Sequence, residues 1–186
     1  MAALEYPTPP LRDAVVLLRP WRTQDVPEKL MAFNDPVIRQ FAWSRTTAYS
    51  EADAREYFVE QEQARQSGSA LTVAIASPLD EAVILGGASL YDVDLNQARA
   101  GIGYWLAPDA RGRGAATHTV RLLAGWAFST LGLQRIELTC GPDNDGSQRV
   151  AERCGFVHEG VLRSHLAFKG GRRDSMIFSL LPGELR

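Results

Sequence analysis

A loop with two arginines and two glycines joins an apolar segment to a predicted helix in the middle of the chain. The loop reads Arg111-Gly112-Arg113-Gly114 and runs directly into Ala115-Ala116. The first backbone N–H groups of a helix have no partner within it, and the helix dipole places about half a positive charge beside them. Glycine and alanine keep these groups accessible to a large anion. The pattern predicts a pyrophosphate-binding site, and an ordinary strand-to-helix connection is the alternative.

The loop does not match two common phosphate-binding motifs. A Walker loop needs Lys and then Ser or Thr after its last glycine, where this chain has Ala115 and Ala116. A dinucleotide-binding fingerprint that begins at Gly112 would need its third glycine at Thr117. No acidic residue ends a following strand at the place that this fingerprint requires. Both motifs are therefore excluded.

Apolar periodicity predicts the strands and helices that would position the loop. We expect strands at residues 14–18, 70–76, 83–91, 100–106, 135–140, 156–168 and 173–181. We expect helices that begin near residues 23, 50, 116 and 144, the first of them interrupted by Pro36. The middle strands form an antiparallel meander, and a strand-helix-strand unit follows it. The prediction is a single α/β (α+β) domain over residues 1–186, with the proline-containing residues 1–13 as a loose lead-in.

Charge and composition exclude several classes of function. The formal net charge of −2 argues against a general nucleic-acid surface, so no DNA partner is expected. No stretch approaches the ~20 apolar residues that cross a bilayer, and the first ten residues lack an export signal. We therefore expect a cytoplasmic protein without membrane contact. Cys140 and Cys154 are interpreted as reduced core thiols, with metal ligation or nucleophilic catalysis as alternatives, and no bound metal is predicted.

Motifs spread over most of the chain resemble those of one acetyltransferase family. Arg111-x-x-Gly114-x-Ala116, after the Tyr104-Trp105-Leu106 strand, resembles the pyrophosphate-binding pattern of the GCN5-related N-acetyltransferases (GNAT), which is Gln/Arg-x-x-Gly-x-Gly/Ala. A downstream set resembles the second motif of the RimJ/RimL-type branch, which includes enzymes that acetylate the amino termini of ribosomal proteins. The residues that match this second motif are Asn144-x-x-Ser147, Val150-Ala151-Glu152-Arg153-x-Gly155-Phe156 and Glu159-Gly160. The early Leu18-Arg19-Pro20 and the late Asp174 also fit the family.

The resemblance implies a GNAT fold with acetyl-CoA as the cosubstrate. In this fold a mixed and largely antiparallel sheet of about seven strands carries helices on both faces, and a splayed parallel pair of strands holds CoA. The gap would fall between residues 102–106 and 135–140. Backbone groups at Trp105 and Leu106 would hold the pantetheine arm, and the N–H groups of residues 111–116 would hold the pyrophosphate. The Trp105 side chain has a second interpretation, as a core aromatic.

Two residues of the downstream motif are candidates for contact with the cofactor. Asn144 resembles the family's CoA-contacting asparagine, and it is also a good helix N-cap; the two roles are compatible. Ser147 matches a serine near the CoA sulfur that can protonate or stabilise the departing thiolate. The alternative for Ser147 is a small helix residue without a catalytic role.

The general base is the open point of the sequence. In this branch a glutamate can act from the strand after Glu159-Gly160, but the roughly corresponding residue here is Leu166. The adjacent His165 is a possible base because imidazole titrates near neutral pH. Side chains alternate along a strand, so His165 need not face the cleft. Glu137, on the strand beside the gap, is a second candidate, and a water-mediated proton path is a third.

The expected acceptor is a primary amine, either a protein N-terminal α-amine or a small molecule. Direct attack on the thioester needs no covalent enzyme intermediate, and an α-amine with a pKa of about 8 loses its proton more easily than a lysine with a pKa of about 10.4. Residues 23–66 and 162–173 would build the acceptor pocket. Phe41, Trp43 and Tyr57 are interpreted as walls of this pocket or as simple packing residues.

Other functions and assemblies stay open at this point. A catalytically silent acyl-CoA sensor is the main alternative, because the family glutamate is replaced by Leu166. A ribosome contact is a weaker one, through the basic residues Arg163, Lys169, Arg172 and Arg173, which a solvated hairpin would also explain. A homodimer is possible by analogy with the family.

Overall fold

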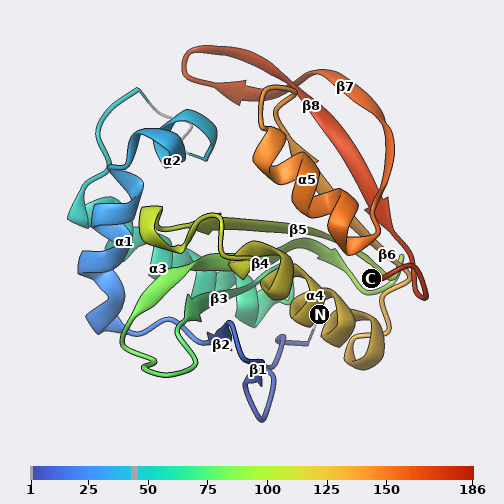
Figure 1. Cartoon of the computed structure of the whole chain (residues 1–186), viewed down its shortest axis with the longest axis horizontal. Helices are drawn as coiled ribbons and strands as arrows, with labels where there is room; N and C mark the ends of the chain where they lie inside the picture. The colour runs from blue at the N-terminus through green and yellow to red at the C-terminus, as the bar shows by residue number, and fades with distance from the viewer. Residues whose placement is uncertain (1, 43–45) are drawn as a thin grey trace.

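A single twisted sheet runs through the computed structural model, which describes residues 2–42 and 46–186 (Figure 1). Within these residues the sheet has eight strands in the order β1-β2-β3-β4-β5-β6-β8-β7. The strands are β1 (Leu11–Arg12), β2 (Leu17–Arg19), β3 (Leu71–Ala76), β4 (Ile84–Asp94), β5 (Arg99–Leu106), β6 (Arg135–Cys140), β7 (Val157–Phe168) and β8 (Gly171–Leu180). Trp43, a predicted pocket wall, lies outside the described residues.

Helices cover both faces of the sheet, as predicted. Figure 1 shows α3 behind the sheet and α4 in front of it. The α-helices are α1 (Val26–Phe33), α2 (Pro36–Phe41), α3 (Glu51–Ser67), α4 (Ala115–Thr130) and α5 (Asp145–Cys154), and 3₁₀ turns lie at Thr23–Asp25 and Pro108–Ala110. Pro36 does divide the first helical region, because it occupies the first turn of α2 and Asp35 caps that helix. No helix among the described residues is long and apolar enough to cross a membrane.

Strands β5 and β6 form the predicted splayed parallel pair. Their register ends at Gly101 and Glu137, whereas β6 continues to pair with β8 as far as Cys140. All other neighbouring strands of the described sheet are antiparallel. The edge of β5 from Ile102 to Leu106 therefore has no strand partner on the β6 side, and its backbone groups are available to a ligand.

Two hydrophobic clusters fix the elements around this gap. In the main cluster, the inward face of α4 packs on the sheet through Val120, Leu123 and Ala127, all at 0% exposure. The helical spacing of these residues was the basis for predicting the helix. The second cluster joins α1, α2 and α3 through residues such as Phe33 and Tyr49, and Trp105 packs against it. It thereby attaches the three helices to β5.

The amino-terminal segment is packed, so the prediction of a loose lead-in over residues 1–13 is wrong in this respect. Leu4 is 3% exposed, and its backbone N–H donates to the Arg65 carbonyl at 3.0 Å. The Arg65 guanidinium donates to the Leu4 carbonyl at 2.7 Å and lies 5.3 Å from the Tyr6 ring centroid. Leu11 then begins β1, the strand that raises the total above the expected seven. The prolines restrict this backbone and are themselves partly or fully exposed, but Leu4 and Tyr6, which precede them, contact Arg65 of α3.

Arg19 of the Leu18-Arg19-Pro20 motif has a structural role. Its guanidinium donates to both carboxylate oxygens of Asp25 at 2.8 and 2.9 Å, and both side chains are 2% exposed. It also donates to the backbone carbonyl of Glu81 at 2.7 Å. Such a two-pronged pair with additional hydrogen bonds satisfies the buried charges, and it holds the start of α1 against the sheet.

Candidate functional site

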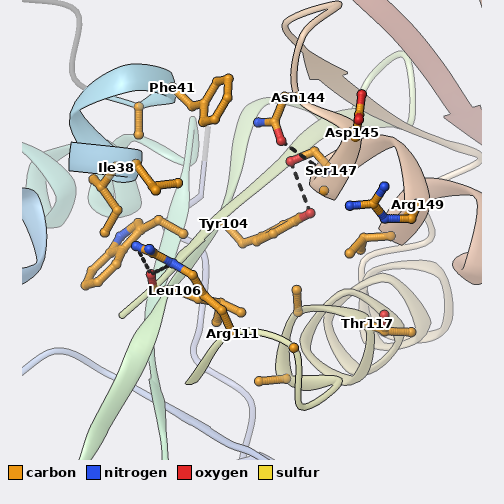
Figure 2. Close-up of a pocket in the computed structure, with 18 of the residues that line it drawn as sticks. Ile38, Phe41, Tyr104, Leu106, Arg111, Thr117, Asn144, Asp145, Ser147 and Arg149 are labelled. Carbon is orange, nitrogen blue, oxygen red and sulfur yellow. Dashed lines mark hydrogen bonds between the residues drawn. The ribbon is translucent and has the colours of Figure 1, made fainter. Parts of the chain in front are cut away.

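A cavity of about 530 Å³ lies where β5, α2, α4 and α5 meet (Figure 2). The last three residues of β5 form its floor, and the start of α4 forms one end. Its lining includes Tyr104, Trp105, Leu106, Arg111, Gly112, Gly114, Ala115, Ala116, Thr117, Asn144 and Ser147. Most residues of the predicted cofactor site are therefore brought together around one cavity. Arg113 is the exception, because it is exposed and does not line the cavity.

The start of α4 has the features of the predicted anion site. Gly114 is the N-cap with φ of +84°, a left-handed conformation that glycine adopts without strain. No side chain among the described residues caps the helix, and Ala115, Ala116 and Thr117 of its first turn line the cavity. The N–H groups of a first turn have no acceptor within the helix. This end of the cavity therefore offers backbone donors and the positive end of a helix dipole to an anion.

The Arg111 side chain holds the loop in place instead of pointing freely at an anion. Its guanidinium pairs with Asp35 at 2.5 Å. It also donates to the Leu106 carbonyl, as Figure 2 shows. Burial alone would raise the pKa of Asp35, but the hydrogen bonds from Arg111 and from the Ile38 N–H outweigh it and lower that pKa. The ion pair thus connects the glycine loop to the N-terminus of α2. The predicted contribution of Arg111 to anion binding stays a prediction.

Two arginines that the sequence analysis did not single out also line this cavity. Arg149 and Arg153 lie one turn apart on α5, and both are exposed. Their i, i+4 spacing within the second motif was the available signal. They add positive charge to the mouth of the cavity, where a phosphate group would be exposed to solvent.

Asn144, Ser147 and Tyr104 form a polar group beside the open edge of β5. Asn144 caps α5, because its Oδ1 accepts the Ser147 N–H at 3.1 Å. The Tyr104 hydroxyl donates to Ser147 Oγ at 3.2 Å (Figure 2). Burial raises the pKa of Tyr104 to about 12, despite the opposing effect of the Ser147 hydrogen bond. Tyr104 thus remains a protonated donor at neutral pH. Sequence reasoning named it only as part of the strand.

Three cavities adjoin Tyr104 of this polar group. A second cavity of about 330 Å³ lies between α3 and the β4–β5 strands, and a third of about 150 Å³ occupies the β5–β6 gap. Ala42 and Tyr104 line all three cavities, and Ser147 lines the first and third. A reaction that needs two substrates can therefore take place where these cavities join.

The Trp105 side chain is a packing residue, in agreement with the alternative considered for it. Its ring stacks on Trp21 at 6.0 Å between centroids and meets Phe33 edge-on at 5.1 Å. Trp105 nonetheless lines the first and second cavities. Trp105 is thus part of the wall of both the first and the second cavity.

The structure does not bring the candidate bases to the site. Leu166 lines the third cavity, and its neighbour His165 lines none of the three, as the alternation of side chains along a strand allows. Glu137 is likewise absent from the three linings, and it accepts a hydrogen bond from Arg135 at 2.7 Å. The hypothesis that either residue is the base has no geometric support.

The two cysteines are buried, in line with their interpretation as core thiols. Cys140 lines the third cavity, and Cys154 packs in the main core. Burial raises the pKa of each thiol to about 11. The thiolate is the reactive form of cysteine, so neither residue is suited to nucleophilic catalysis at neutral pH.

Comparison with known proteins places this geometry in a family. The model of the acetyltransferase (GNAT) domain matches residues 16–157. "Probable N-acetyltransferase YjcK" of Bacillus subtilis is 30% identical over 92% of this chain and 96% of its own length. "Putative ribosomal N-acetyltransferase YdaF" of the same organism is 36% identical, but the match spans 59% of this chain and 60% of that protein. RimJ of Mycobacterium smegmatis, solved in complex with CoA-disulfide, is 25% identical with a TM-score of 0.79, over 94% of this chain and 87% of the other. The chain therefore belongs to the GNAT acetyltransferases, in the RimJ/RimL-type branch.

Proposed function

We propose that this protein is an acetyl-CoA-dependent N-acetyltransferase that acts on a primary amine, either a protein N-terminal α-amine or a small molecule. The observation that carries the proposal is one continuous cavity. It connects the uncapped N-terminus of α4, the unpaired edge of β5 and the Tyr104–Ser147 pair. The N-terminus of α4 suits a pyrophosphate, and the edge of β5 suits an amide-containing arm. The Tyr104–Ser147 pair offers a hydrogen-bond donor to a leaving group.

The cofactor would bind along this cavity. The first-turn N–H groups of α4 hold the pyrophosphate, with Arg149 and Arg153 near the mouth. The pantetheine amides pair with the open edge of β5 in the manner of an added strand. The thioester then lies where Ala42, Tyr104 and Ser147 line the junction of the cavities.

The reaction is a direct transfer. The neutral amine attacks the thioester carbonyl, the C–N bond forms, and the electron pair of the C–S bond moves to sulfur. Ser147 Oγ, itself supported by the Tyr104 hydroxyl, stabilises the departing thiolate, and the amine proton leaves to solvent. The protein needs no nucleophile of its own.

A silent acyl-CoA sensor is the second candidate function. Leu166 lines the gap where relatives of this branch can carry a glutamate, so this position supplies no carboxylate to the cavity. Turnover distinguishes the two functions. An enzyme releases CoA thiol from acetyl-CoA when a suitable amine is added, and a sensor releases none with any amine.

A substitution at the N-cap tests the cofactor site. Gly114→Asp tolerates the left-handed backbone and places a carboxylate on the first-turn N–H groups of α4, where it would repel a pyrophosphate. We expect the Kd for acetyl-CoA in isothermal titration to rise on the order of 100-fold, because like charges in contact cost several kcal/mol.

Gly132→Asp is the matched control for this substitution. Gly132 has φ of +70° beyond the far end of α4, and a Cβ there would meet no atom within 4 Å. We expect it to bind acetyl-CoA like the parent protein. If Gly114→Asp also binds like the parent, the N-terminus of α4 is not the pyrophosphate site and the proposed function loses its basis.

A further inference from the structure

The second cavity is the space from which an acceptor would approach the thioester. It has a volume of about 330 Å³ and shares Ala42, Tyr104 and Trp105 with the cofactor cavity. Its floor is formed by the middle of β4 and β5, and α3 forms the wall away from the junction. Given the proposed function, an amine in this cavity reaches the acetyl carbon only at the shared residues.

The α3 wall of this cavity is acidic. Asp53, Glu56 and Glu60 line it at helical spacing, and no Lys, Arg or His of the described chain lines it with them. Asp53 belongs to the capping box with Ser50. Glu56 and Glu60 are exposed, and neither forms a hydrogen bond or an ion pair with any residue that the structure describes. Two carboxylates are thus available to a cationic group of a ligand.

The aromatic wall of the cavity encloses a buried amine on its protein side. Lys29 is 0% exposed, and its Nζ has no hydrogen-bond partner among the described residues. This Nζ lies 3.6, 4.2 and 5.3 Å from the ring centroids of Tyr57, Phe33 and Trp105, and all three residues line the cavity. Burial lowers the pKa of Lys29 to about 7, whereas burial raises that of Tyr57 to about 12.

The cavity is therefore electrostatically polarised. Near the aromatic residues at the junction, an ammonium group would face the buried amine of Lys29, so this end favours a neutral amine. At the α3 wall, a protonated amine would pair with Glu56 and Glu60. The apolar ring surfaces between the two ends accommodate methylene groups.

We propose that the acceptor is a linear α,ω-diamine, bound with its reacting amine at the Ala42–Tyr104–Trp105 junction and its other, protonated amine against Glu56 and Glu60. The proposal rests on the proposed function and specifies its substrate class. Glu56 and Glu60 are then specificity-determining residues, because they bind the part of the acceptor that does not react.

A matched pair of amines tests the proposal. The rate of CoA thiol release is measured for 1,4-diaminobutane and for n-butylamine, each compared at an equal concentration of free amine. We expect kcat/KM for the diamine to exceed that for the monoamine by about 5- to 10-fold, because solvent screens ion pairs with exposed carboxylates. Equal values overturn the proposal and leave the transfer function standing. A kcat/KM for a peptide α-amine without a basic side chain that exceeds the diamine's also overturns the proposal and leaves the transfer function standing.

A double substitution tests the residues. In Glu56→Gln/Glu60→Gln we expect the diamine preference to disappear, through a loss of kcat/KM for the diamine alone, with butylamine within twofold of the parent. The control is Glu51→Gln/Glu152→Gln, which removes two exposed carboxylates outside the three cavities and keeps the preference. An equal loss for both amines indicates a structural role and overturns the proposal. If acetyl-CoA binds and neither amine reacts, the acceptor assignment is overturned, and the transfer activity is overturned with it only when peptide α-amines release no CoA thiol either.

Discussion

At the residue scale, the proposed chemistry depends on a contact between residues 43 positions apart. Ser147 stands at the start of α5, and Tyr104 stands near the end of β5; their hydroxyls meet at 3.2 Å beside the gap. A lone serine hydroxyl is a weak acid, but a second hydroxyl that donates to it makes it a better donor to a developing thiolate. The pair explains how the site can stabilise the leaving group without a reactive cysteine.

Removing either hydroxyl of this pair slows transfer more than it weakens cofactor binding. We expect Tyr104→Phe and Ser147→Ala each to lower kcat about 10- to 100-fold, because the stabilised charge exists only in the transition state. The Kd for acetyl-CoA changes less than threefold by the same reasoning. Thiol-release kinetics and titration calorimetry measure the two quantities.

Tyr6→Phe is the control for these variants, since Tyr6 packs on Arg65 away from the cavities. A kcat for Tyr104→Phe and Ser147→Ala that equals the parent value contradicts the assigned role.

At the element scale, Gly155 of the second motif terminates α5 and packs against the carboxy-terminal residues of the chain. Its φ is +94°, and its N–H caps the carbonyls of Ala151 and Glu152. A Cβ at this position would lie 2.1 Å from the Glu184 carbonyl oxygen, which belongs to the backbone and cannot turn aside. The conformation and the close approach both require glycine here.

Substitution of this glycine destabilises the fold. We expect Gly155→Ala to lower the free energy of unfolding by about 2–4 kcal/mol, from left-handed strain and a backbone clash. Gly132→Ala carries the same strain at φ of +70° but has open space around it, so it costs about 1 kcal/mol. Urea denaturation of both variants measures the difference in unfolding free energy. Equal losses would contradict the prediction, because they would mean that the Glu184 backbone moves away from the new Cβ without loss of stability.

The glycine loop and α2 show which parts of the site short-range sequence patterns could predict and which parts they could not. The helix start at Gly114, the cap at Asn144 and the strand before the loop follow from rules that act over a few neighbouring residues. The pair between Arg111 and Asp35 joins residues 76 positions apart, and no local rule places them together. The arginine was therefore assigned to the anion, whereas the fold uses it to connect the loop to α2.

At the scale of the whole molecule, Lys29 couples the stability of the fold to pH. This side chain is one of two lysines in the chain, and it is enclosed by aromatic rings without a hydrogen-bond partner in the described structure. Its pKa is about 7 when folded, against 10.5 for an exposed lysine. The unfolded chain therefore binds more protons between these two values, and stability rises with pH across that window. Below pH 7 both states are protonated, and the full cost of burying the charge is present.

Replacing Lys29 with an uncharged side chain of similar length removes this dependence. We expect Lys29→Met to be more stable than the parent below pH 7, by up to roughly 5 kcal/mol, less whatever the ring contacts contribute. The advantage shrinks as pH rises toward 10. Denaturation at pH 6, 8 and 9.5 measures the trend. Lys169→Met, in the exposed β7–β8 turn, is the control and follows the parent at every pH. A constant difference between Lys29→Met and the parent would contradict the assignment.

The sequence by itself determined most of the strands and helices and the start of α4 after the glycine loop, because these depend on backbone geometry and on apolar periodicity, which neighbouring residues encode. Its motifs indicated the family, and the resemblance implied the splayed pair. Only the tertiary structure decided that Leu166 and not His165 faces the gap, that residues near Leu4 are packed against α3, and that Lys29 lies behind the aromatic wall of the second cavity. Those outcomes depend on which distant surfaces bury one another. Burial changes the charge state and the contacts of a side chain, and the residues next to it in the sequence do not determine whether it is buried.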